Sequence, residues 1–146
     1  MTSGTMIGIV TFIYLGAFSC LLVGRLLDKK RLANAAFLGA VGGFALLTAG
    51  LVLRWRESYA MGIGHVPLSN FYESLVFFSW ATTLITFAGI RGEARNRVLT
   101  FIMPAAALML GYASFSPGID SSIQPLIPAL KSNWLAIHVI TCFLGY

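Results

Sequence analysis

Long apolar runs constrain the fold of this chain more than any other feature of its sequence. No charged residue interrupts the stretch from Met6 to Gly24 or the stretch from Leu32 to Leu53. An α-helix rises about 1.5 Å per residue, so about 20 such residues cross the roughly 30 Å hydrocarbon core of a membrane. Each of these two stretches is therefore predicted to be a transmembrane helix.

Three further apolar runs follow along the chain. The predicted fold is an all-α integral membrane protein, a multi-span helical bundle with four full transmembrane helices plus a truncated fifth, at about 6–24, 32–53, 71–90, 98–113 and 134–146. The fifth is called truncated because a helix from Trp134 to Tyr146 rises only roughly 20 Å. Residues 1–146 are accordingly interpreted as the N-terminal part of one transmembrane domain. Pro104 is expected to kink the fourth span.

Composition agrees with a membrane location. Hydrophobic residues make up 58% of the chain and charged residues only 10%, which is outside the range of soluble domains. The net charge of +5 is therefore assigned to the connections between spans, and no nucleic acid partner is predicted. Cys20 and Cys142 form no Cys-x-x-Cys motif, which argues against a thiol-disulfide exchanger and against a cytochrome with its own covalent haem. No basic residue precedes the first run, so a cleavable signal peptide is not expected.

Lysine and arginine gather in alternate connections. Those after the first and third predicted spans are Arg25, Lys29, Lys30, Arg31, Arg91, Arg95 and Arg97, whereas the opposite side has Arg54, Arg56 and Lys131. Because cytoplasmic connections carry the excess of basic residues, the N-terminus is predicted to lie outside. The polar connection 54–70 and the proline-rich segment 114–133 share that outer side, which faces the periplasm or a lumen. The apolar piece Ile123–Leu130 is expected along the membrane surface or beneath a neighbouring part of the protein.

Two local patterns concern helix packing and capping. Ala35, Gly39 and Gly43 recur every four residues, which predicts a helix face that another backbone approaches closely. Asn70 followed three residues later by Glu73 resembles a capping box at the start of the third span. A structural role for Glu73 is favoured over a catalytic or proton-relay role, since its carboxylate also faces the positive end of the helix dipole.

Two histidines are candidates for binding haem iron, because a neutral imidazole offers one ring nitrogen as an axial ligand. His138 lies about 6 Å into its predicted helix when counted from Trp134 at the membrane interface. Ionisable groups within spans are costly and usually functional, although His138 could instead bond a neighbouring helix. His65 is a loop residue and is interpreted as structural. A bis-histidine pair of the two is possible in principle, and nothing in their spacing requires it.

Two stretches resemble a known family. Gly64-His65-Val66-Pro67-Leu68-Ser69-Asn70-Phe71-Tyr72-Glu73-Ser74-Leu75, with Phe78-Ser79-Trp80, closely resembles the early signature of the CcsA (ResC-like) cytochrome c assembly proteins. The run from Pro128 to Val139, continuing to Leu144-Gly145-Tyr146, is similar to the same family's helix that leads toward its haem site.

The resemblance implies a function in cytochrome c assembly at the bacterial inner (plasma) membrane or the thylakoid membrane, embedded in membrane lipid. It implies a ResB/CcsB-type membrane partner, haem b as the held substrate, and attachment of that haem to the Cys-x-x-Cys-His motif of apocytochrome c at the outer face. By motif position His138 matches a haem-iron axial ligand. Trp134, His65 and Glu73 are candidates for outer-face support only, and no catalytic residue is assigned.

Part of the family pattern has no counterpart in these residues. The tryptophan-rich segment and the second outer histidine come later in the family than position 146. The chain is therefore expected to supply one ligand of a cytochrome c haem lyase (synthase) complex and to attach no haem alone. The alternatives are a membrane scaffold or transporter fragment with structural histidines, and a b-type electron carrier. The electron carrier would need a second histidine within a span, which this sequence lacks.

Overall fold

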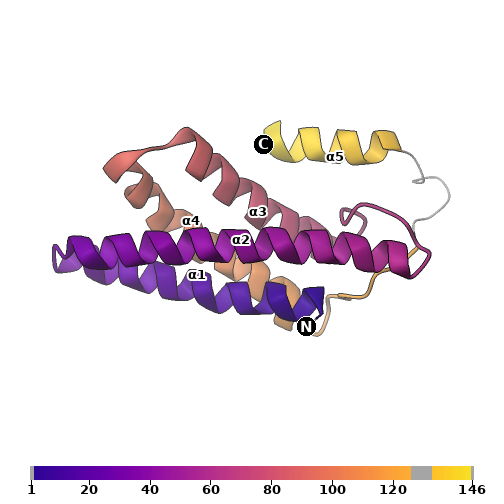
Figure 1. The fold of residues 1–146 in the computed structure, drawn as a ribbon, viewed down its shortest axis with the longest axis horizontal. Coiled ribbons are helices and arrows are strands. Elements are labelled where there is room, and N and C mark those ends of the chain that lie inside the picture. Colours follow the sequence, from indigo (N-terminus) through magenta and orange to yellow (C-terminus); the bar gives the residue numbers. More distant parts are fainter. Residues whose placement is uncertain (1, 126–132, 146) are drawn as a thin grey trace.

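The computed structural model describes residues 2–125 and 133–145, and these residues form five α-helices and no strand. The helices are α1 (Ser3–Leu26), α2 (Lys30–Ala60), α3 (Phe71–Gly89), α4 (Gly92–Phe115) and α5 (Asn133–Gly145), as Figure 1 shows. By length and composition, α1 to α4 could each cross a membrane. This confirms the predicted all-α membrane class with four full spans.

Helix α1 holds the bundle together, because it packs along both α2 and α4, while α3 packs along α4. The buried apolar residues of α1 recur every three or four positions, which is the spacing of one helix face: Ile7, Val10, Tyr14, Ala17 and Leu21. The buried apolar residues of α4 follow a similar spacing: Leu99, Met103, Ala106, Ala107, Leu110 and Ala113. The core therefore runs along the length of α1.

Small residues of α2 permit the close approach of α1. A Cβ atom added at Gly43 would lie 2.6 Å from Cε1 of Tyr14, which is closer than side-chain atoms pack. Gly39 also faces α1, as predicted, whereas Ala35 is exposed. The close face instead continues toward Gly50. Helix association in lipid depends on such packing, since lipid tails are as apolar as the side chains themselves.

Two helices are longer than the apolar runs predict. Helix α2 continues to Ala60 instead of ending near Leu53, because its backbone hydrogen bonds continue through the polar residues that follow the apolar run. The helix ends just before Gly62, which has a φ of 73°. At about 1.5 Å per residue, its 31 residues span about 46 Å, well beyond the hydrocarbon thickness. Helix α4 begins at Gly92 instead of Val98 and contains Pro104. The predicted connection 91–97 is therefore mostly helical.

The bundle has two ends that are built from different segments of the chain (Figure 1). The loop end contains the start of α1, the end of α2, the connection 61–70, the start of α3 and residues 116–125, which are called the strap below. The basic end contains the turn between α1 and α2 and the turn between α3 and α4. The predicted surface location of Ile123–Leu130 falls mainly on residues outside the described part of the chain.

Candidate functional site at the loop end

A buried ion pair joins α2 to α3 at the loop end. Nε of Arg54 lies 2.8 Å from Oε1 of Glu73, and the two side chains are only 4% and 1% exposed. The guanidinium carbon of Arg54 lies 4.7 Å from the centre of the Tyr72 ring. Burying two charges is costly unless further hydrogen bonds satisfy them. The surroundings of the pair supply these bonds.

A second nitrogen of the Arg54 guanidinium binds the strap. Nη2 donates to the carbonyl oxygens of Ser121 at 2.9 Å and of Ser122 at 3.3 Å. The amide of Asn70 also donates to the carbonyl of Ser122, at 3.2 Å. Charge-assisted bonds such as those from Arg54 are stronger than bonds between neutral groups. Arg54 therefore holds the strap and α3 together.

Both oxygens of Glu73 are engaged. Oε1 pairs with Arg54, while Oε2 accepts hydrogen bonds from the backbone N–H of Ser69 at 2.7 Å and from its hydroxyl at 2.8 Å. The backbone N–H of Glu73 donates to the Asn70 side chain, which caps α3 as predicted. The carboxylate reaches back to Ser69 instead of to the N–H of Asn70, one residue earlier than a standard capping box. This arrangement favours the structural interpretation of Glu73.

His65 is enclosed at the same end and is 6% exposed. Its backbone N–H donates to the Ser58 hydroxyl at 3.1 Å. Its ring nitrogens each face a backbone carbonyl at 2.9 Å, Nδ1 that of Val66 and Nε2 that of Gln124. A carbonyl oxygen only accepts hydrogen bonds, so each contact is a hydrogen bond when that nitrogen carries a proton. Neither nitrogen is open to an iron atom in this arrangement, which favours a structural role for His65.

The strap has its own internal fold around Asp120. One carboxylate oxygen accepts from the backbone N–H of Ser122 at 2.8 Å, and the other accepts from the side-chain amide of Gln124 at 2.6 Å. The bonds from Ser122, led by that of its backbone N–H, lower the pKa of Asp120 below its usual value, with help from Gln124. Asp120 therefore shapes the strap whose carbonyls Arg54 and His65 bind.

A third acidic residue, Glu57, ties down the start of the chain. The backbone N–H and the hydroxyl of Ser3 both donate to the carboxylate of Glu57. Glu57 lies in the part of α2 that extends past the predicted span, and its negative charge meets the positive N-terminal end of α1. The longer α2 is therefore what makes this contact possible.

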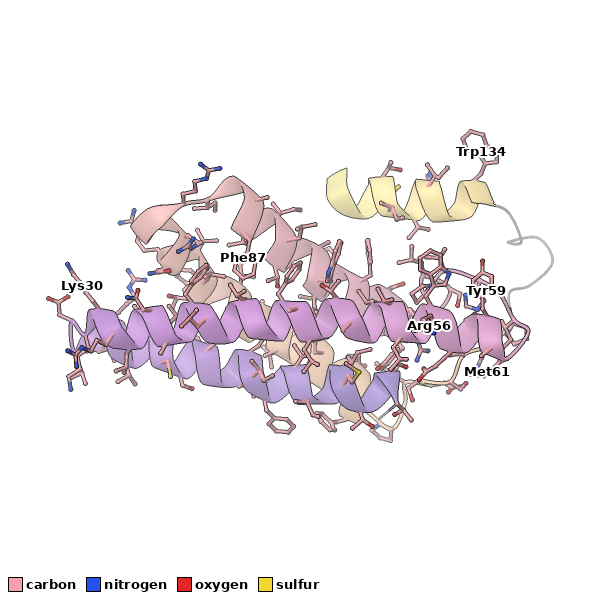
Figure 2. All side chains as sticks on the ribbon, in the orientation of Figure 1. Lys30, Arg56, Tyr59, Met61, Phe87 and Trp134 are labelled. Carbon is pink, nitrogen blue, oxygen red and sulfur yellow. The ribbon has the colours of Figure 1, made fainter. Side chains whose placement is uncertain are left out.

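His138 has a different environment from His65. It is exposed on α5, where Nε2 lies 3.7 Å from the Cys142 sulfur one turn further along. Trp134, on the preceding turn, is 77% exposed and points away from the bundle in Figure 2. The hydroxyl of Thr141 binds carbonyls of its own helix. Among the described residues, no three His, Cys, Asp or Glu side chains gather as a metal site.

The predicted site residues thus separate into two groups. Glu73 and His65 lie in one buried network at the loop end, and His138 and Trp134 lie on α5, which contacts α3. Among the described contacts, none joins His65 to His138. Sequence reasoning missed Arg54 as the centre of the network. A possible signal was its position directly after an apolar run, where burial would require a carboxylate partner.

Comparison with known proteins finds one matching family model and several relatives. A family model described as cytochrome C assembly protein matches residues 68–146, a range that includes Glu73, the strap and His138. The cytochrome c biogenesis protein CcsA of Parasynechococcus marenigrum (strain WH8102) is 38% identical over 144 residues, which is 94% of this chain and 46% of the relative. CcsA of Prochlorococcus marinus (strain MIT 9303) is 42% identical over 102 residues, 69% of this chain and 30% of the relative.

The similarity extends to a plant protein. CcsA of Welwitschia mirabilis is 38% identical over 119 residues, which is 80% of this chain and 37% of the relative. The chain therefore spans less than half of the length of these relatives. No solved structure matches it.

Proposed function

This chain belongs to the cytochrome c assembly protein family and is similar to cytochrome c biogenesis proteins, and we propose that it acts in cytochrome c biogenesis by helping to hold haem at the loop end of the bundle. In this proposal the loop end faces the periplasm or the thylakoid lumen. The excess of lysine and arginine at the basic end supports this orientation, since such an excess marks the cytoplasmic side.

His138 is the proposed axial ligand of haem b. The observation that carries this assignment is the contrast between the two histidines. Both ring nitrogens of His65 face backbone carbonyls. Among the described residues, the contact of the exposed His138 ring at Nε2 is with a thiol, a weak hydrogen-bonding partner. An imidazole nitrogen without a strong partner can donate its lone pair to iron. The match of His138 to the family's ligand position supports the same assignment.

The buried network at the loop end has a positioning role in this proposal. Arg54, Asn70 and His65 fix the strap, and the chain continues from the strap to α5. Fixing the start of that connection limits where α5 can lie. Arg54 and Glu73 therefore act on the haem site through the path of the backbone and do not touch the substrate.

The bond-forming chemistry belongs to the substrates. Haem supplies vinyl groups, and the apocytochrome c supplies the thiols of its Cys-x-x-Cys-His motif, which add across those double bonds to form thioethers. The contribution of this chain is to bind and orient haem at the membrane surface. A ResB/CcsB-type membrane partner and the apocytochrome are the proposed partners in this step.

Replacing the proposed ligand tests the assignment. The His138→Ala variant, purified from membranes, should lose most of its bound haem as measured by its haem absorption spectrum, and added imidazole should restore the spectrum. The Thr141→Val variant is the matched control, because Thr141 is exposed on the same helix and its hydroxyl bonds only that helix. Full haem content in His138→Ala, with no response to imidazole, would contradict the proposal and support the reading of a scaffold with structural histidines.

A further inference from the structure

A cavity of about 500 Å³ opens at the basic end, away from the loop-end site. Its walls come from the end of α1, the turn that follows it, the start of α2 and the start of α4: Leu21, Gly24, Arg25, Asp28, Lys29, Lys30, Ala33, Asn34, Gly92, Arg95, Asn96 and Arg97. Figure 2 labels Lys30 at this end, where several side-chain nitrogen atoms are drawn.

Cationic side chains dominate the described walls of this cavity. Five are basic (Arg25, Lys29, Lys30, Arg95 and Arg97), and one, Asp28, is acidic. Among the described side chains, none of these five forms an ion pair, since the pair that is found joins Arg54 to Glu73. Gathering like charges is unfavourable unless an anion or solvent compensates them. The cavity is therefore suited to an anionic ligand.

Two buried polar atoms next to the cavity have no hydrogen-bond partner among the described residues. They are Nε of Arg95, a donor, and Oδ1 of Asn96, an acceptor. The Arg95 guanidinium carbon lies 3.6 Å from the centre of the Phe37 ring, which holds the group in place. Buried polar groups normally have partners. Both atoms are closed to solvent, so the contacts to a ligand come from the exposed cationic side chains of the wall.

The helix dipoles at this end add smaller contributions to the attraction of an anion, some favourable and some unfavourable. Helices α2 and α4 begin here, and their N-cap residues Lys29 and Arg91 make no side-chain capping bond. In α2 the N–H groups of Lys29 and Leu32 already bond backbone carbonyls, so those of Lys30 and Arg31 remain for an anion. Helices α1 and α3 end at the same place with opposite dipoles, so the cationic side chains provide most of the attraction.

The position of the cavity at the ends of the apolar runs favours a membrane ligand. Leu21 and Gly24 of α1 and Ala33 of α2 form an apolar part of its wall, and they lie at the ends of the uncharged stretches of these two helices. Phospholipids place a phosphate beside apolar chains at that level, and basic pockets between helices bind such headgroups. We infer that this cavity binds the phosphate of an anionic phospholipid headgroup through the exposed cationic side chains of its wall.

Native mass spectrometry of the purified protein tests this inference. The protein is incubated with phosphatidylglycerol, with phosphatidylcholine or with inorganic phosphate, and bound molecules are counted. Phosphatidylglycerol should be retained in preference to the other two. The Lys30→Gln/Arg97→Gln variant should weaken its binding about tenfold, since charge-assisted hydrogen bonds to phosphate are lost. Both residues are exposed, so the variant should fold. A second variant, Arg95→Gln, removes another cationic side chain from the cavity wall and should also weaken the binding of phosphatidylglycerol.

The matched control is Arg31→Gln/Arg91→Gln, which removes the same charge at the same end from exposed residues that do not line the cavity. It should change binding less than about twofold. Equal loss in both double variants would overturn the inference, because the basic residues would then act only as a general charge or a topology signal. Equal retention of inorganic phosphate and phosphatidylglycerol would overturn the lipid assignment. The readout does not depend on haem.

Discussion

The two ends of the bundle differ in whether their charged side chains are paired within the protein. At the loop end, Arg54 and Glu73 are buried, paired and surrounded by further hydrogen bonds. At the basic end, five cations gather around an open cavity without an ion pair among the described side chains. The charges at the loop end are therefore compensated within the protein, whereas those at the basic end need solvent or a bound anion to compensate them. Removing charge should therefore be harmful at one end and tolerated at the other.

The largest effect is expected from breaking the buried pair. Glu73→Ala leaves the Arg54 charge buried without a partner, which should cost about 3–5 kcal/mol of unfolding free energy. Unfolding by denaturing detergent in mixed micelles measures this loss. The double variant Arg54→Met/Glu73→Met is the control, and it should lose less, because it leaves no buried charge alone and loses only the bonds from the pair to the strap and to Ser69. An unfolding free energy of Glu73→Ala equal to that of the unmodified protein would show that the buried pair does not stabilise the loop end.

Removing His65 should have a smaller and more local effect. His65→Ala leaves the carbonyls of Val66 and Gln124 without their ring partner, which should cost about 1–3 kcal/mol. Hydrogen exchange should increase in the strap more than in the core of α1. The same measurement on His138→Ala should show an unchanged strap, since His138 is exposed on α5. Equal protection of the strap in both variants would contradict the anchoring role of His65.

Acid should loosen the strap through Asp120. The pKa of Asp120 is lowered, so its carboxylate stabilises the strap at neutral pH, and this contribution disappears as the pH falls through the lowered value. The window therefore lies below about pH 4, the range where an unperturbed aspartate titrates. NMR titration of the carboxyl carbon should give a midpoint below that of a model peptide. Asp120→Asn should remove the acid sensitivity, and its persistence would indicate another group.

The smallest effect is expected at the basic end. In detergent without added phospholipid, Lys30→Gln/Arg97→Gln should change the unfolding free energy by less than about 0.5 kcal/mol, because both side chains are exposed and unpaired among the described residues. The measurement is the one used for Glu73→Ala, so the two ends are compared directly. A loss of unfolding free energy as large as that of Glu73→Ala would contradict the proposed difference between the two ends.

The spans, the class of fold and the cap of α3 could be predicted from the sequence, because apolar length and capping residues are local signals. The extension of α2 to Ala60 could not, since polar residues continue a helix without leaving an apolar pattern. The pairing of Arg54 with Glu73 depends on how α2 and α3 meet, which no spacing along the chain encodes. For the same reason, the carbonyl partners of His65 became evident only in three dimensions.

The strap is held through its main chain. Arg54, Asn70 and the His65 ring all meet carbonyl oxygens, those of Ser121, Ser122 and Gln124. Every amino acid, proline included, has such an oxygen. The anchor thus recognises the path of the backbone, and only Asp120 and Gln124, whose side chains shape that path, contribute by their identity. Substitutions elsewhere in the strap should therefore leave it in place as long as Arg54, Glu73 and His65 are kept.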